Sequence, residues 1–412
     1  MDSHIKRPRP DGCEEPLQYG KRCFPDRSTH PVSLITCSSS TYMYEARTRK
    51  KTSDLNDTRK ILEQMSSWTD TPNSVRKVLE HLKSKQAAGD ILLEDSVRGK
   101  FLSFHRDITD ECSIEDKQHS WGVIEKQEEV IMYGPFYPNH NNREHSEDVV
   151  IRQTQELLES EEVSEDSKVF IFTLNSPCLV RNTNPCMLNL VQKAHEWWNV
   201  YGVKTHVGFK RSWGFKGSKE SLFRGVSCSQ VECVNQSADY KSYCEAAERI
   251  PELHPLCETM FSVTKHMLKP GPESFPLITD QGPDWKSYFK DMHSVAACKP
   301  EEEKKLLMGE VSLMVETARV LLSEKNNSLE DYLEKGRAFV LKYAFSSHAC
   351  DALQPDLRRT FQESWMKMVR GKYAEFVRET LTEDFNQCTV WLCIKDIQKV
   401  AEKFLKIGKL SL

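Results

Sequence analysis

The sequence lacks any segment that is long and apolar enough to cross a membrane as a helix, because its 412 residues contain no run of eighteen or more apolar residues. The first ten residues, Met-Asp-Ser-His-Ile-Lys-Arg-Pro-Arg-Pro, also lack the apolar core of a secretory signal peptide. We therefore expect no membrane segment. An intracellular location, in the nucleus, the cytoplasm or both, is the default prediction.

Other absences narrow the class of protein. Fourteen cysteines are spread over a long chain with many lysines and glutamates, unlike the disulfide framework of a small secreted domain, so we expect most thiols to be reduced and buried. The formal net charge is only −4, so nucleic acid would have to be bound by local groups of basic residues. No internal repeat and no sustained heptad pattern occurs. The length and the 38% of hydrophobic residues fit a globular chain of two or three domains.

Composition and periodicity divide the chain into four parts. Residues 1–54 are rich in proline, serine, threonine, arginine and lysine and show no period, which is typical of a disordered tail. The basic clusters of this tail could be a nuclear import signal, or they could simply be solvated charges without such a role. Residues 55–114 have the spacing of packed helices, and residues 115–250 mix β-branched runs with helical stretches. Residues 251–412 predict a helical C-terminal domain. Its helices are expected at about 301–324, 328–346, 356–381 and 389–407.

The region 115–250 has the element order of an α/β sandwich around one central sheet. A near-continuous apolar run from Val169 to Leu174 is typical of a strand buried on both faces. Two shorter β-branched or aromatic runs precede it and are separated by a charged turn, as in a hairpin. The order strand, strand, helix, strand, helix, strand is expected at about 120–125, 129–133, 145–160, 169–174, 187–201 and 203–209.

One imidazole and two thiols lie at joints between these elements. His145 precedes a helix, Cys178 follows the buried strand, and Cys186 begins the next helix, where free backbone amides and the helix dipole favour thiolates. Three nitrogen and sulfur ligands can hold a catalytic zinc ion and leave its fourth position to water. The sequence therefore predicts a zinc site made of His145, Cys178 and Cys186.

Glu147 is the candidate general acid and base of this site. A carboxyl group with a raised pKa could take a proton from the water and return it to a leaving nitrogen. Residues two apart on a regular helix point about 200° away from each other. Glu147 and His145 therefore converge only if the first turn of the helix is irregular, which the Pro- and Asn-rich loop before them allows.

These motifs resemble a known signature. His145-Ser146-Glu147, followed by Ser176-Pro177-Cys178 and Cys186, is similar to the H-x-E and P-C-x-x-C motifs of the zinc-dependent cytidine deaminase superfamily. The similarity is greatest to the AID/APOBEC-like branch and covers about residues 115–250. It implies a three-layer sandwich with a central mixed sheet, flanked here by helical regions. It also implies zinc-dependent hydrolysis of the exocyclic amine of cytosine in single-stranded DNA or RNA.

The interval between the cysteines departs from the signature. Seven residues, Leu179 to Pro185, stand where the family usually has two. If this insert loops out, Pro185-Cys186 can restart the helix and present its sulfur to the metal. If it does not, the metal site is lost.

The stretch from Lys204 to Arg224, which includes the last strand and the loop after it, could hold a polynucleotide. Lysines and arginines alternate there with aromatic residues, an arrangement that binds phosphates and stacks on bases, and the alternative is a half-buried strand with a solvated basic edge. The resemblance places the loop that contacts the base beside the target at Arg211 to Lys219. The residues expected to bind nucleic acid are Lys210, Arg211, Trp213 and Phe215.

The loop before His145 offers further substrate contacts. Asn139 and Asn141 are candidates for the asparagine that, in similar deaminases, hydrogen-bonds the sugar. Tyr137 could wall the base pocket or belong to the core.

Two alternatives to a polynucleotide deaminase stay open. One is a deaminase of free cytidine or its nucleotides. The other is a non-catalytic interaction protein that keeps the fold and binds a protein partner through the helices of 251–412. The sequence does not distinguish cytosine from adenine, or DNA from RNA.

Overall fold

The computed structural model describes residues 22–23, 58–69, 71–84, 89, 91–111, 117–127, 129–160, 166–181, 184–215, 223, 258–259, 261–263, 274–277, 285–296, 300–322, 327–346 and 353–411. The chain forms two units, the first made of Met1–Val78, Ala87–Gly217 and Asn386–Leu412, the second of Leu79–Gln86 and Ser218–Phe385. The tail predicted at 1–54 lies outside the described residues except for 22–23. The boundaries predicted near 114 and 250 also lie outside them and stay predictions.

The first unit is built on one mixed sheet in the order β1-β3-β2-β4-β5-β6. Its strands are β1 (Arg22–Cys23), β2 (Ser120–Glu125), β3 (Glu129–Phe136), β4 (Lys168–Asn175), β5 (Lys204–Arg211) and β6 (Leu405–Lys409). Strand β2 pairs antiparallel with β3 and β4, whereas β4, β5 and β6 run parallel to one another. The mixed sheet predicted from the sequence is confirmed.

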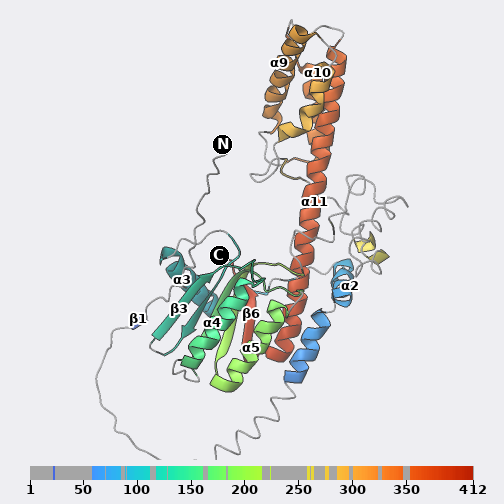
Figure 1. Ribbon diagram of the computed structural model, residues 1–412. Helices are drawn as coiled ribbons and strands as arrows, with labels where there is room; N and C mark the ends of the chain where they lie inside the picture. The colour runs from blue at the N-terminus through green and yellow to red at the C-terminus, as the bar shows by residue number, and fades with distance from the viewer. Residues whose placement is uncertain are drawn as a thin grey trace, which may run out of the picture. The chain divides into compact units, whose positions relative to one another are not determined.

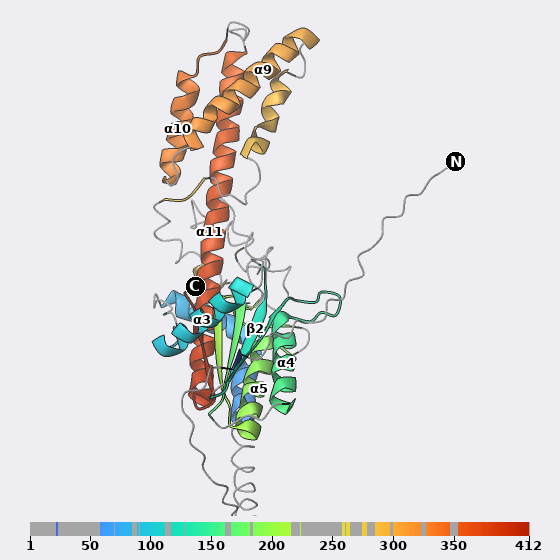
Figure 2. The ribbon, with the colours of Figure 1, turned by 90° about the vertical axis from the view of Figure 1, so that its left-hand side faces the viewer.

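Helices cover both faces of this sheet (Figure 2). On one face lies α3 (Asp95–Glu111), whose Phe101 and Phe104 pack edge-on against Phe170 of β4. On the other face lie α4 (Ser146–Ser160) and α5 (Cys186–Tyr201). The three-layer α/β sandwich is therefore confirmed.

The C-terminal end of the chain differs from its prediction. The helices expected at 356–381 and 389–407 form one helix, α11 (Gln354–Ala401), and the residues after it form β6 (Figure 1). The backbone N–H of Thr205 donates to Phe404 O at 2.8 Å, where β6 begins to pair with β5. The ladder to β5 satisfies the backbone of 405–409 and buries Leu405 and Ile407, so a distant strand determines the structure of this segment.

The second unit is helical in its described residues. It contains the 3-10 helix η2 (Trp285–Ala296), α9 (Glu301–Thr317), η3 (Ala318–Leu322), α10 (Leu329–Lys342) and the part of α11 up to Phe385. A capping box begins α10, where the backbone N–H of Asp331 donates to Ser328 Oγ at 3.1 Å. Aromatic rings fill the unit, and the ring of Phe223 packs edge-on against that of Phe385 at 6.0 Å. In neither unit is a described helix long and apolar enough to cross a membrane.

Candidate metal centre

Three side chains meet where the carboxyl end of β4 faces the first turns of α4 and α5. His145 directly precedes α4, and its backbone N–H donates to Asp148 Oδ2 at 2.9 Å, which caps the helix. Cys178 follows β4 closely, and Cys186 is the first residue of α5. The backbone N–H of Cys186 is directed at Cys178 Sγ at 3.5 Å, so the amino end of α5 faces a sulfur.

The distances among the three side chains fit a tetrahedral zinc ion. His145 Nδ1 lies 3.3 Å from Cys186 Sγ and 3.7 Å from Cys178 Sγ, and the three ligand atoms lie within 4.8 Å of one another. Zinc bonds of about 2.3 Å to sulfur and about 2.0 Å to nitrogen separate neighbouring ligand atoms of a tetrahedron by about 3.6 Å. In the described part of the chain, no other group of three or more His, Cys, Asp or Glu side chains converges in this way.

The protonation of the two thiols indicates that a cation suits this site. A hydrogen bond from the Cys186 thiol lowers the pKa of Cys178 to about 5, and the same bond, together with burial, raises the pKa of Cys186. The hydrogen bond to Cys178 also raises the pKa of His145. Without a cation, one sulfur keeps its proton, whereas a metal ion binds both as thiolates. Both sulfurs are buried and free of disulfides.

Glu147 lies in the first turn of α4 and is only 5% exposed. Its carboxylate accepts hydrogen bonds from Ser146 Oγ at 3.1 Å, Thr173 Oγ1 at 3.3 Å and Gln118 Nε2 at 3.4 Å. Burial raises the pKa of Glu147. Because His145 precedes the helix, the two side chains are not held on opposite sides of a regular helix. The buried carboxyl group of Glu147 is close enough to the centre for Cys178 and His145 to act on it electrostatically.

The comparison with known families agrees with this geometry. A family model described as Secreted Novel AID/APOBEC-like Deaminase 3 matches residues 27–407. The chain belongs to this family. No curated protein sequence and no solved structure matches the chain. The AID/APOBEC-like relationship predicted from the motifs is confirmed, and the match extends beyond 115–250 into the helical regions on both sides.

The family description corrects the predicted location. Members of this family of deaminases are described as secreted, so the predicted nuclear or cytoplasmic location is wrong. The predicted location is wrong because the composition of the first ten residues does not by itself identify a compartment. Secretion brings a protein into oxidising conditions that favour disulfides, which makes the two free thiols of the centre notable.

The insert between the cysteines does not separate the sulfurs. Leu179 is buried, and Pro185 precedes α5 with an extended backbone, φ −60° and ψ 145°, so that Cys186 begins the helix as expected. The backbone N–H of Met187 donates to Cys178 O at 3.1 Å, which fixes the end of the loop against its beginning. Residues 182 and 183 lie outside the described residues.

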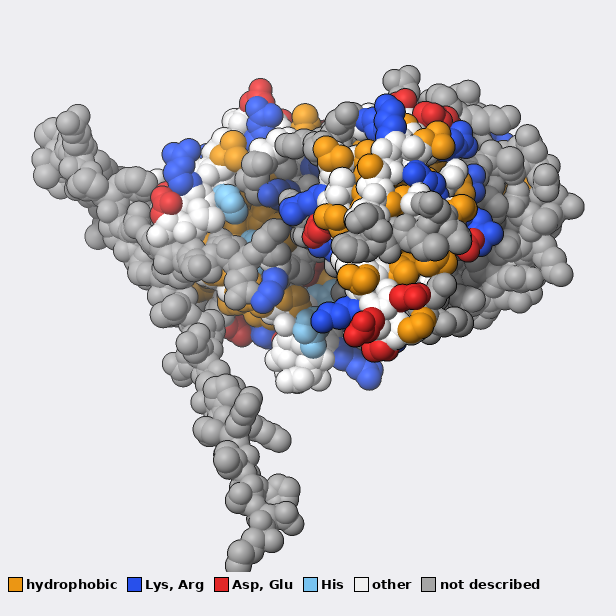
Figure 3. Space-filling model, turned by 90° about the horizontal axis from the view of Figure 1, so that it is seen from above, with side chains coloured by type: hydrophobic (Ala, Val, Ile, Leu, Met, Phe, Trp, Pro, Cys, Tyr) orange, Lys and Arg blue, Asp and Glu red, His pale blue; other side chains and the backbone are white. Residues whose placement is uncertain are grey.

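The end of β5 is joined to the motif that carries Cys178, whereas Lys210 alternates to the face of the sheet that α3 covers, where its charge acts on His105. Lys210 and Arg211 are exposed, and Arg211 O accepts a hydrogen bond from Ser176 N at 2.7 Å. The backbone N–H of Trp213, which is half-buried, donates to Ser176 Oγ at 2.9 Å. The loop after β5 is thus attached to the Ser-Pro-Cys motif. On the described part of the face in Figure 3, basic, acidic and hydrophobic side chains are interspersed.

Phe215 differs from its predicted role. The side chain is only 7% exposed, because it packs inside the unit, so its ring offers no face for stacking on a base in this structure. Of the same stretch, Phe209 and Phe223 are also buried, and Lys216, Lys219 and Arg224 lie outside the described residues.

The loop before His145 presents its candidates at the surface. Tyr137 is 39% exposed, and its ring lies 6.1 Å from that of His119. Asn139 Oδ1 accepts a hydrogen bond from Asn141 N at 3.2 Å, so this side chain shapes the turn, while Asn141 is exposed at its tip. All three side chains are exposed and so have the accessibility that a substrate contact requires, although Asn139 Oδ1 is already hydrogen-bonded within the turn.

Sequence reasoning missed the polar residues that hold Glu147. Thr173 is the one hydroxyl in the apolar run of β4, and strand alternation directs it to the face opposite Phe172, where α4 lies. A single hydroxyl in an otherwise apolar strand is the one feature of the sequence that could have predicted this contact with Glu147. Gln118 reaches Thr173 Oγ1 at 3.0 Å and Ser146 Oγ at 3.3 Å, contacts between elements that no local pattern contains.

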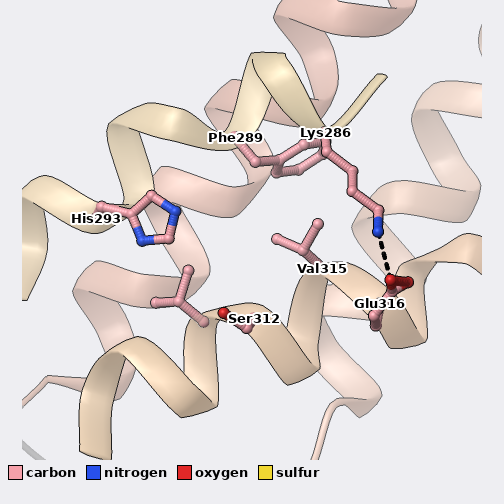
Figure 4. A pocket seen from close by; sticks show the side chains of 7 residues that line it. Lys286, Phe289, His293, Ser312, Val315 and Glu316 are labelled. Carbon is pink, nitrogen blue, oxygen red and sulfur yellow. Dashed lines mark hydrogen bonds and ion pairs between the residues drawn. The ribbon is translucent and has the colours of Figure 1, made fainter. Parts of the chain in front are cut away.

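The second unit contains a hollow of about 190 Å³ between η2 and α9 (Figure 4). Its polar side chains already have partners, since Lys286 pairs with Glu316 and His293 Nδ1 lies 3.1 Å from Met308 Sδ. No set of metal ligands converges there among the described residues. Among the described residues, the converging metal ligands therefore lie in the first unit.

Proposed function

We propose that the protein is a zinc-dependent deaminase that hydrolyses the exocyclic amine of cytosine in single-stranded nucleic acid. The observation that carries this proposal is the convergence of His145, Cys178 and Cys186 within 4.8 Å, with the buried Glu147 next to His145 in the helix cap. Membership of an AID/APOBEC-like deaminase family supports it. Zinc held by these three side chains would act as a Lewis acid that makes a bound water acidic near neutral pH.

Glu147 is the proposed proton carrier. Its carboxylate takes a proton from the attacking water, a C–O bond forms at C4 of the base, and the proton is passed to the amine nitrogen. The C–N bond then breaks, and ammonia leaves a uracil. A raised pKa suits a group that must accept and donate a proton in turn. Ser146, Thr173 and Gln118 hold the carboxylate for both steps.

Two features support a polynucleotide over a free nucleoside. Arg211 is exposed at the end of β5, where its backbone is bonded to the Ser-Pro-Cys motif, and could contact a phosphate beside the reacting nucleotide. Lys210, exposed on the α3 face, could contact one further along the strand of nucleic acid. Trp213 is attached through Ser176 to the motif that carries Cys178, so a base stacked on its ring would lie near the centre. A free nucleoside has no phosphate groups with which these basic side chains could pair.

The test measures metal content and activity on the same purified chain. We expect stoichiometric zinc that is lost when Cys178 and Cys186 are changed to Ser, and deamination of cytosine in single-stranded DNA or RNA. Protein without zinc would contradict the proposal. Activity on free cytidine alone would favour the small-substrate alternative. Zinc without turnover of any of these substrates would favour a non-catalytic interaction protein that works through the helices of 251–412.

A further inference from the structure

One side chain of the insert reaches back to the metal centre. Arg181 is only 16% exposed, and its Nη1 donates to Asp148 Oδ2 at 2.6 Å and lies 3.7 Å from Cys186 Sγ. Its Nη2 donates to Arg143 O at 2.8 Å. One guanidinium thus joins the insert, the loop before α4, the first turn of α4 and a metal ligand.

Asp148 extends this link to a second ligand. Its Oδ2 accepts both the Arg181 guanidinium and the backbone N–H of His145, at 2.6 and 2.9 Å. Arg181 therefore acts on Cys186 directly and on His145 through the helix cap. Because both charged side chains are largely shielded from water, this pair holds its geometry better than an exposed ion pair does.

The charge of Arg181 has the sign that a zinc site with two thiolates needs. An N–H···S bond from a cation stabilises negative charge on Cys186, which is the form that binds metal. Arg181 also offsets the negative charge of Asp148, with which it pairs.

We infer that Arg181 is a positioning residue of the metal centre, which folds the seven-residue insert back and holds the second thiolate on the metal. This inference rests on the proposed zinc site. The insert is where the cysteine spacing exceeds the two residues of the family signature. When only two residues separate the cysteines, the short turn allows few positions for the second sulfur. A seven-residue loop allows many more positions, and the contacts of Arg181 restrict them.

The experiment measures zinc affinity by competition with a chelator, in the full chain and without substrate. We expect Arg181→Ala to weaken zinc binding by about 10- to 100-fold, the usual effect of removing a residue that supports a metal ligand. Arg181→Lys should also weaken it, because one ammonium cannot reach Asp148, Cys186 and Arg143 O together. In cobalt-substituted protein, the sulfur-to-metal charge-transfer bands should lose intensity in Arg181→Ala.

Arg152→Ala is the matched control. Arg152 pairs with Glu144, directly before His145, but contacts no metal ligand, so its zinc affinity should equal that of the wild type. Unfolding of the metal-free proteins in chelator checks the fold, and if Arg181→Ala does not fold, Arg181→Lys and the cobalt spectrum decide. Equal zinc affinity in wild type and folded Arg181 variants would overturn the inference, whatever the deamination assay shows. Weakened zinc binding without turnover of cytosine would support the inference and contradict the proposed substrate.

Discussion

The indole of Trp68 donates a hydrogen bond to Asp396 Oδ2 at 3.0 Å, across 328 residues of sequence. Both side chains are buried, and Lys77 and Lys399 pair with the same carboxylate. Burial alone would raise the pKa of Asp396, but the hydrogen bonds from Lys399, Lys77 and Trp68 outweigh it and lower the pKa. The helix at 58–69, which contains Trp68, and the end of α11 therefore belong to the unit that carries the metal centre.

Asp396→Ala should destabilise that unit, because it removes the shared acceptor of one buried indole and two ammonium groups. We expect a loss of about 2 kcal/mol in the free energy of unfolding, measured with urea. Asp95→Ala is the control, since Asp95 is exposed and pairs only with Arg98 one turn away, so a change below about 0.5 kcal/mol is expected. Equal losses in the two variants would contradict the role of the Asp396 network.

Two glycines should respond to alanine with opposite signs. A Cβ at Gly122 would lie 2.3 Å from the ring of Tyr133, whose hydroxyl is hydrogen-bonded to Thr154 at 2.7 Å, so the ring cannot easily move. Gly122→Ala should cost about 2 kcal/mol. Gly99 lies in α3 with nothing within 4 Å of such a Cβ, so Gly99→Ala should stabilise by about 0.5–1 kcal/mol. Thermal unfolding of both variants checks the signs.

The free energy of unfolding should decrease when the pH is lowered, because the folded protein holds His206 in its neutral form. The ring stacks on Phe170 at 5.0 Å, and burial, together with Lys406 and Lys168, lowers its pKa from 6.5 to about 4. Between these values the unfolded chain binds a proton that the folded chain does not, so acidification from about pH 6.5 to about pH 4 should cost up to about 3 kcal/mol. Urea unfolding of metal-free protein across this range should show a shallower dependence in His206→Phe. Parallel curves would count against the buried neutral imidazole.

Glu147→Gln should separate chemistry from metal binding. The amide cannot carry the proton, so kcat is expected to fall by about 10²- to 10⁴-fold, while zinc content stays stoichiometric. The substitution also removes a buried carboxylate whose pKa is raised by burial, so the free energy of unfolding at neutral pH should not decrease. Retained activity in this variant would remove Glu147 from the mechanism.

The residues of the metal centre could be predicted because each is determined by a local joint. His145 and Glu147 open a helix, and Cys178 ends a run, Val169 to Leu174, whose apolar pattern predicts a buried strand by itself. Their convergence then follows from the usual packing of helices on a sheet. The two-residue spacing of His145 and Glu147 was resolved by the cap, because His145 lies before the helix.

What could not be predicted depends on partners far away in the sequence. Leu405 to Lys409 forms a strand because its backbone pairs with that of β5. No pattern within these five residues predicts that pairing. The Arg181 contact with Asp148 joins residues 33 positions apart, and its arginine stands in an insert without a regular period. Phe215 is buried by the fold of its unit, although the sequence around it is rich in basic residues.

The ring contact between Phe223 and Phe385 has a consequence for the order of folding. It joins the two ends of the segment that separates β5 from β6. Once it forms, the parallel strands are linked by an effective loop of roughly thirty residues in place of roughly 190, which lowers the entropic cost of closing the sheet by about 1.5 kcal/mol. We therefore expect the helical segment to fold early and the last strand to join the sheet late. Early folding of the helical unit would then speed the completion of the sheet that carries the metal centre.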